Sequence, residues 1–207
     1  MKLLLGTRNK GKIAEFEAVF KDMKLELVLP DAMGITEDPE ETGGTYEQNA
    51  LLKARFYANA SKLPAIADDS GIMVEALSGE LGVKTRRWGA GKDATDTQWI
   101  AYFLERMVAE ENRAARFVSV ITFIDNKGEE HVFTGTCDGV ISRTLEGEYL
   151  PGLPLRSCFK PLGFNRTLSH LTLEEEMSVN HRYKAMMQLK EHLMNRRLKS
   201  PVNDSHY

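Results

Sequence analysis

The chain of 207 residues has little cysteine, no long apolar run and no strong excess of charge of either sign. Its two cysteines, Cys137 and Cys158, cannot build a disulfide framework, which favours a reducing compartment and predicts a cytoplasmic location. The sequence has no Cys/His spacing typical of a zinc site. Its apolar runs are too short for a transmembrane segment, and the stretch at residues 3–5 is too short for a signal peptide. We therefore expect no contact with a membrane.

A formal net charge of −3 gives no support for a surface that binds a nucleic acid polymer, but it leaves room for a local nucleotide pocket. Hydrophobic residues make up 42% and charged residues 28%, which is typical of a globular domain. The length suits a single domain with two lobes over residues 1–199, followed by a disordered tail at 200–207.

Hydrophobic periodicity predicts strands and helices that do not alternate strictly, so we expect an α/β fold with a mixed sheet flanked by helices. The expected strands lie at 3–6, 25–29, 64–67, 117–125 and 131–142, and the expected helices at 10–21, 45–61, from 95 onward and 183–198. Residues 31–44 and 143–161 are expected to be irregular. The stripe of Trp99, Phe103 and Met107 predicts a core face rather than a ligand site.

The most informative stretch joins an apolar run at 64–67 to two adjacent carboxylates, Asp68 and Asp69, followed by Ser70 and Gly71. Such a pattern is typical of a buried strand that delivers acids to its C-terminal end, where α/β proteins often place their sites. Adjacent carboxylates repel each other unless a metal or a proton compensates. A plain strand-to-turn junction is the alternative, because Asp-Asp-Ser-Gly also suits a turn.

The first strand-to-helix junction, residues 6–12, offers backbone amides together with Thr7, Asn9 and Lys12. These groups suit a phosphate, although their spacing differs from that of a Walker-type loop. Glu15 shares a helix face with Lys12, so the two could form an ion pair or serve a phosphate and a metal. An ordinary capped helix start is the alternative.

Two further groups of polar residues follow. Glu40 and Glu41 end an acidic loop and could be a solvated charge run. The next helix carries Asn49 and Lys53 at i, i+4 spacing, which could be an ordinary polar face.

Together these motifs resemble the Ham1 family, the inosine/xanthosine triphosphate pyrophosphatases, also called non-canonical purine NTP pyrophosphatases. The motifs are Thr7-x-Asn9-x-x-Lys12-x-x-Glu15, Glu41-Thr42-Gly43, Asn49-Ala50-x-x-Lys53-Ala54 and Ala67-Asp68-Asp69-Ser70-Gly71. The match continues through Arg87, Ala115-Arg116-Phe117, Gly135 and Gly139-Val140-Ile141 to His181-Arg182 and Ala185. Four motifs in the family's order make chance a poor explanation.

The resemblance implies an elongated, two-lobed Ham1/Maf-like fold with a central cleft, usually as a homodimer. It implies hydrolysis of a nucleoside triphosphate to the monophosphate and pyrophosphate with Mg²⁺. Carried over residue by residue, Thr7, Asn9 and Lys12 would hold the triphosphate, and Lys53 would contact the phosphates or the acidic cluster. The metal-binding carboxylates would be Glu15, Glu41, Asp68 and Asp69. Asp69 would also be the general base, and Ser70 would help to position the sugar and phosphates.

The C-terminal third departs from the family pattern. The family leads us to expect Gly-Phe-Gly-Tyr-Asp-Pro-Ile-Phe, but residues 152–159 place Leu153 at the stacking aromatic and Arg156 at the aspartate. An expected lysine is Glu176, and an expected serine is Asn180. Two charges are therefore reversed at the base-recognition end. The resemblance also implies base contacts from the pair His181-Arg182, for which a surface pair is the alternative.

We hypothesise that the reversed charges form a compensated swap, in which Glu176 accepts a hydrogen bond from an exocyclic amine. The substrate would then be a modified or non-canonical purine nucleotide with altered base specificity. Drift at a solvated rim would leave Arg156 and Glu176 without a role and keep a standard dITP/ITP/XTP house-cleaning activity. A nucleotide-binding sensor without turnover is the alternative of another class.

Overall fold

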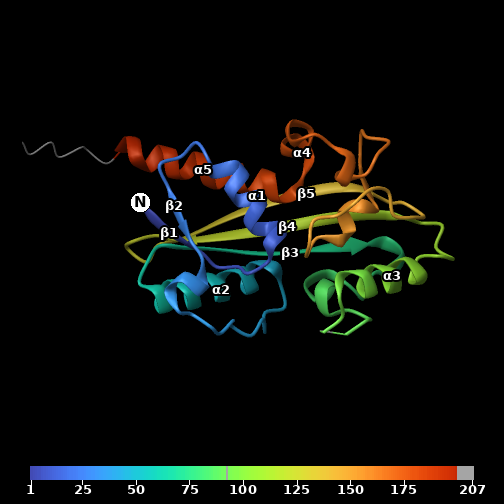
Figure 1. Cartoon of the computed structure of the whole chain (residues 1–207), viewed down its shortest axis with the longest axis horizontal. Helices are drawn as coiled ribbons and strands as arrows, with labels where there is room; N and C mark the ends of the chain where they lie inside the picture. The colour runs from blue at the N-terminus through green and yellow to red at the C-terminus, as the bar shows by residue number, and fades with distance from the viewer. Residues whose placement is uncertain (92, 200–207) are drawn as a thin grey trace, which may run out of the picture.

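The computed structural model describes residues 1–91 and 93–199 and is built on one six-stranded mixed sheet (Figure 1). Its strands, in spatial order, are β2 (Glu26–Val28), β1 (Lys2–Leu5), β3 (Ala65–Val74), β4 (Ala114–Ile124), β5 (Glu130–Ile141) and β6 (Phe159–Pro161). β2, β1 and β3 run parallel, and β3 to β6 are antiparallel neighbours. The predicted mixed sheet is confirmed. Among the described residues, no helix has the length and apolar character needed to cross a membrane.

Helices cover both faces of the sheet, and the molecule is elongated along the strands (Figure 1). α1 (Lys10–Phe20), α4 (Leu173–Val179) and α5 (His181–Lys199) lie on one face, and α2 (Tyr46–Ser61) and α3 (Asp96–Arg106) lie on the other. The predicted stripe on α3 is confirmed as core, because Trp99, Phe103 and Met107 are all buried. The Trp99 and Phe103 rings stack with their centroids 5.5 Å apart.

The start of α2 forms only half of the capping box that Thr45 and Gln48 could make. The Thr45 hydroxyl accepts from the Gln48 amide at 3.1 Å. The Gln48 side chain, however, accepts from the amide of Gly44 rather than from that of Thr45. The end of the loop before α2 is therefore held by the helix it precedes.

The predicted end of the third strand at residue 67 is wrong, because β3 continues to Val74. β1 pairs with β3 only as far as Ile66, but β4 pairs with β3 along all ten residues, with Asp68 opposite Ile121. The backbone therefore stays extended through the two acids, and the alternative of a turn at Asp68-Asp69 is wrong. Because β1 ends before Asp68 and Asp69 are reached, the edge of β3 that faced β1 has no strand partner at these two acids within the described part of the chain.

Other boundaries also moved. The segment expected to be irregular at 143–161 contains a short 3-10 helix, Pro154–Ser157, and the edge strand β6. The last helix begins at His181, two residues earlier than expected. The single two-lobed domain over 1–199 stays a prediction, and the tail predicted at 200–207 lies outside the described residues.

Candidate active site

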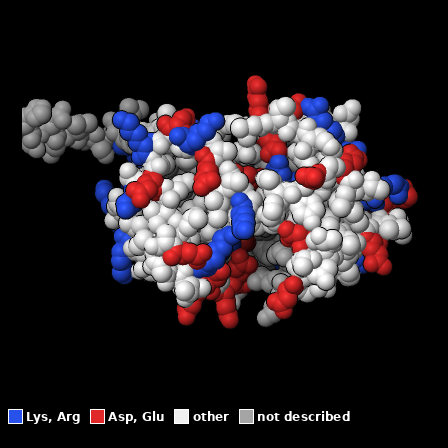
Figure 2. Space-filling view, in the orientation of Figure 1, with Lys and Arg blue, Asp and Glu red and all other residues white. Residues whose placement is uncertain are grey.

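A cavity of about 350 Å³ opens where β1 stops beside β3. The space-filling view shows this face hollowed near its middle, with acidic side chains gathered around the hollow (Figure 2). The predicted site residues that line it are Thr7, Asn9, Lys12, Glu15, Glu41, Lys53, Asp68, Asp69, Ser70, Arg156, His181 and Arg182. Segments far apart in the sequence thus converge, and Glu176 is the one predicted site residue outside this lining.

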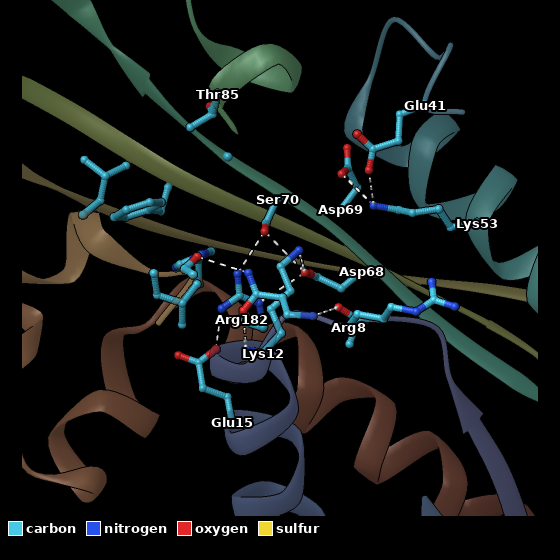
Figure 3. A pocket seen from close by; sticks show the side chains of 18 of the residues that line it. Arg8, Lys12, Glu15, Glu41, Lys53, Asp68, Asp69, Ser70, Thr85 and Arg182 are labelled. Carbon is cyan, nitrogen blue, oxygen red and sulfur yellow. Dashed lines mark hydrogen bonds and ion pairs between the residues drawn. The ribbon is translucent and has the colours of Figure 1, made fainter. Parts of the chain in front are cut away.

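Asp68 is almost fully buried and lies between two cations (Figure 3). Its Oδ2 is 2.6 Å from Lys12 Nζ and 3.3 Å from Arg182 Nε. Its Oδ1 accepts from the hydroxyl of Ser119, and Ser70 Oγ donates to Oδ2 at 3.3 Å. Burial alone would raise the pKa of Asp68, but Lys12 and Arg182 outweigh burial and hold that pKa well below its ordinary value. Asp68 is therefore a permanent carboxylate.

Asp69 points to the other side of the cavity, toward Glu41 and Lys53 (Figure 3). Lys53 Nζ lies 2.9 Å from Asp69 Oδ1 and 2.8 Å from Glu41 Oε1, so it bridges the two carboxylates. Burial raises the pKa of Asp69, and the neighbouring ammonium of Lys53 offsets only part of this rise. A carboxylate with a raised pKa is a stronger base than an ordinary aspartate.

A divalent cation fits this side of the cavity. Asp69 Oδ2 is buried and has no hydrogen-bond partner, which is unusual for a carboxylate oxygen. Glu41 lies across Lys53 from it, and hard cations such as Mg²⁺ prefer one or two carboxylates together with water and phosphate oxygens. Asp69 and Glu41 could therefore hold Mg²⁺, with Asp68 beside them.

A tighter cluster of possible ligands lies elsewhere, at the β4–β5 turn. Asp125, Glu129 and His131 place their ligand atoms within 4.8 Å of one another. The guanidinium of Arg196 already pairs with Asp125 and lies 3.4 Å from Glu129. This cluster has its own cation and does not border the cavity.

The β1–α1 junction, for which the sequence predicts phosphate contacts, forms one wall of the cavity. Asn9 is the N-cap of α1, since its Oδ1 accepts from the Lys12 amide at 3.1 Å. Its Nδ2 donates to the carbonyl of Gly152 at 3.1 Å, so Asn9 also ties the junction to the segment before the Pro154–Ser157 helix. The Thr7 hydroxyl accepts from the Asn9 amide at 3.1 Å. Burial lowers the pKa of Lys12 although Asp68 opposes this shift.

Glu15 stands between two arginines rather than facing an open ligand position. Its Oε1 is 3.0 Å from Arg156 Nη1, and its Oε2 pairs with Arg182 Nη1. Arg156 also pairs with Glu176, and Arg182 with Asp68. The five residues form a buried chain of alternating charge, from Glu176 through Arg156, Glu15 and Arg182 to Asp68. We call it the charge chain.

Arg156 and Glu176, for which the family resemblance implies a place near the base, are both largely buried, so the alternative of a solvated rim there is wrong. Their side chains are only 12% and 7% exposed. His181 is also buried, which contradicts a surface pair, and its ring stacks on Phe117 with centroids 4.6 Å apart. Burial, and then the charge of Arg182, lower the pKa of His181 well below its ordinary value. His181 is therefore a neutral, largely apolar wall at neutral pH.

Sequence reasoning missed several residues of the site. Ser119 is buried in the middle of β4 and donates to Asp68; a lone hydroxyl inside an apolar strand was the available signal. Arg8, Asp38 and Tyr57 line the cavity and contact one another. They lie 19 to 49 residues apart, so no local spacing could reveal them.

A family model described as "Ham1 family" matches residues 3–192. The chain belongs to the Ham1 family. A relative from Haemophilus influenzae named "dITP/XTP pyrophosphatase" is 39% identical to this Ham1 protein over 196 residues, covering 93% of the chain and 98% of the relative. A relative of the same name from Leptospira interrogans is 35% identical over 190 residues, covering 91% and 94%.

Solved structures place the Ham1 protein in the same fold. The structure of a HAM1 protein from Coxiella burnetii matches with a TM-score of 0.80 and 32% identity, covering 94% of this chain and 99% of that one. A nucleoside-triphosphatase, dITP/XTP pyrophosphatase, from Mycobacterium abscessus matches with a TM-score of 0.67 and 36% identity, covering 91% and 97%. The predicted Ham1-type fold is confirmed.

Proposed function

We propose that this Ham1 protein hydrolyses nucleoside triphosphates to the monophosphate and pyrophosphate, with Mg²⁺ held by Glu41 and Asp69 beside the Asp68 carboxylate. The observation that carries the proposal is Asp69, a buried carboxylate in the cavity with a raised pKa and one oxygen without a hydrogen-bond partner. The names of the relatives support the same activity. Mg²⁺ would neutralise phosphate charge at this site.

The residues have separate roles in this proposal. Asp69 accepts the proton of a water molecule whose oxygen bonds to the α-phosphorus. The bond from that phosphorus to the bridging oxygen breaks, and pyrophosphate leaves with the electron pair. Lys12 and Lys53 stabilise the charge on the phosphates, and Ser70 orients the sugar end. Thr7 and Asn9 shape the junction through the hydrogen bonds described above.

The test of the reaction is Asp69→Asn, which keeps the shape of the side chain and removes the base. We expect kcat to fall by about a hundredfold or more, because general-base catalysis contributes about 10²–10⁴-fold. Binding of a non-hydrolysable NTP analogue should persist. If the parent protein binds nucleotides but releases no pyrophosphate from any NTP, the sensor without turnover replaces this proposal.

We further propose that the substrate is a modified or non-canonical purine nucleotide, and that Arg156 sets an altered base selectivity. Arg156 lines the base end, and its guanidinium has more N–H donors than Glu15 and Glu176 use. A donor at this position favours a base edge that carries acceptors, which includes the oxo groups of hypoxanthine and xanthine as well as those of oxidised purines. Glu176 Oε1 accepts from Arg156 and Glu176 lies outside the cavity lining, so we do not expect Glu176 to accept a hydrogen bond from an exocyclic amine of the base.

Pyrophosphate release from dITP, XTP, the canonical NTPs and oxidised purine NTPs tests this selectivity. We expect oxo-bearing modified purine NTPs to be hydrolysed efficiently. In Arg156→Gln, the ratio of kcat/KM between preferred and poor substrates should fall by about tenfold. A clear preference for dITP and XTP over every modified purine would establish the standard house-cleaning activity instead. Unchanged ratios in the variant would remove Arg156 from base recognition.

We also propose that the protein is a cytoplasmic homodimer. Met73, Val140 and Leu162 are 53%, 42% and 66% exposed and line one shallow hollow beside β3 and β5. Such an apolar group is a candidate for contact with a second copy. Light scattering should give twice the chain mass, and Met73→Glu should give one chain mass.

The proposed cytoplasmic location is supported by the cysteines, which are both buried and unpaired, as is usual in a reducing compartment. Cell fractionation tests this location.

A further inference from the structure

Glu41 reaches the cavity on a segment without a helix or strand, residues 34–44, which we call the acidic segment. A segment of this kind has no backbone ladder to fix it, so other groups must set the position of its side chains. At the α2 end, the amide of Gly43 donates to Asn49 Oδ1 at 2.8 Å. Asn49 is fully buried, so this end of the segment is fixed.

The other end of the acidic segment is held by Arg8, from the β1–α1 junction. Arg8 Nε donates to Asp31 Oδ1 at 2.9 Å, just before the segment. Its Nη2 donates to the carbonyl of Ile35, and its Nη1 to Asp38 Oδ1. One planar guanidinium therefore makes hydrogen bonds to three residues within the range 31–38. A lysine lacks the planar set of N–H donors needed for these three contacts.

Tyr57 supplies a second donor to Asp38. Its hydroxyl donates to the same Oδ1 that Arg8 contacts. The Tyr57 ring is buried on α2 against Gly6, where an added Cβ would come within 2.3 Å of the ring. Burial, followed by the hydrogen bond to Asp38, raises the pKa of Tyr57, so its hydroxyl keeps its proton at neutral pH. A rigid ring thus presents a permanent donor to the segment.

We propose that Arg8, Asp38 and Tyr57 form a clasp that positions the Glu41 carboxylate beside Lys53 and Asp69. Asp38 lies three residues before Glu41, which is at most about 10 Å of chain, so movement at Asp38 is transmitted to Glu41. Between the clasp and the hydrogen bond from Gly43, Glu41 has little freedom. The inference rests on the proposed function only in that Glu41 is taken to hold the metal ion.

The test uses two variants of the full chain that leave every proposed metal ligand in place. Tyr57→Phe removes one hydroxyl and keeps the buried ring, and Arg8→Lys keeps the charge and removes the three-point contact. We expect Mn²⁺, added alone and followed by electron paramagnetic resonance, to bind about fivefold to tenfold more weakly to each variant. A Glu-specific protease should cut faster at Glu37, Glu40 or Glu41.

Arg55→Ala is the matched control. Arg55 lies on α2, as Tyr57 does, but it is outside the cavity lining and pairs with Glu130 on β5. This substitution should change neither Mn²⁺ binding nor proteolysis. The clasp is overturned if Tyr57→Phe and Arg8→Lys bind Mn²⁺ within twofold of the parent and are cut at the same rate. Neither readout requires turnover, so the clasp can pass or fail separately from the proposed hydrolysis.

Discussion

At the scale of single residues, a mutation of Glu15 can show whether this side chain binds a metal ion or holds two arginines in place. Both of its oxygens contact arginines, so Glu15→Gln leaves Arg156 and Arg182 without the charge between them. Removing one partner of a buried ion pair costs about 3–5 kcal/mol, and we expect a loss of that size in the free energy of unfolding measured in urea. Binding of Mn²⁺ should be unchanged.

A surface pair gives the comparison for Glu15. Asp22 pairs with Lys190 at 2.6 Å but is largely exposed, so Asp22→Asn should cost less than about 1 kcal/mol. If Glu15→Gln instead keeps its stability and loses Mn²⁺ affinity, Glu15 is a direct metal ligand, as the family resemblance implied.

The pKa of Asp69, which Lys53 influences, should determine how the activity falls at acidic pH. The pKa of Asp69 is raised in the metal-free protein, and bound Mg²⁺ would lower it. The acid limb of kcat/KM should therefore move to higher pH when the Mg²⁺ concentration is reduced. Lys53 opposes the rise, so Lys53→Met should shift the acid limb to higher pH as well as lower the rate. Lys2→Met, which affects an exposed pair with Glu26, should leave the profile unchanged. A limb that stays in place in Lys53→Met would contradict the role of Asp69 as base.

Single residues also show what the sequence could reveal about the site. The acids and lysines that share short motifs, such as Asp68 with Asp69 and Lys12 with Glu15, were predicted and do converge on one cavity. Their partners could not be inferred, because pairing depends on which side chains meet across the fold. Glu15 meets Arg156 across 141 positions of the sequence, and no periodicity encodes such a contact.

At the scale of elements, the packing of α5 on β5 positions His181 and Arg182. A Cβ at Gly135 on β5 would come within 2.0 Å of the carbonyl of His181, which is backbone and cannot turn aside. Gly135→Ala should therefore push the start of α5 outward, with a loss of about 1–3 kcal/mol in stability and a higher KM. At Gly44 an added Cβ meets only Gln48 at 3.7 Å, so Gly44→Ala is the control. Equal stability of the two variants would show that α5 can shift at no cost.

Elements were predicted best where their own sequence determines them. α1, α2, β4 and β5 follow from the periodicity of their own sequences. β3 was cut short at residue 67 because its polar half resembles a turn. Its extended backbone comes from pairing with β4, a strand about fifty residues later, and local propensity does not contain that pairing.

At the scale of the whole molecule, stability should fall in acid. The pKa values of Asp68 and Asp125 are held below their ordinary range, and that of Asp125 is about 2. Groups with depressed pKa values stabilise the fold above the pKa of the unfolded chain, about 3.9, and this stabilisation is lost as the pH falls toward the folded values. The midpoint of urea unfolding should therefore drop between pH 4 and pH 2, below the range in which the raised pKa values of Asp69 and Glu176 act with the opposite sign. A midpoint that is constant over this range would show that these ion pairs contribute little.

The charge chain links the identities of residues that lie twenty positions apart in the sequence. A mutation that reversed only Arg156 would place a carboxylate between those of Glu15 and Glu176, and one that reversed only Glu176 would place a cation against Arg156. Either single step passes through a buried charge without a partner, whereas the double change restores the pair. Across evolution, positions 156 and 176 should therefore change together, so that the ancestry of this protein contains a paired substitution rather than two independent ones. Coupled variation of these two columns in an alignment of Ham1 sequences would record that step.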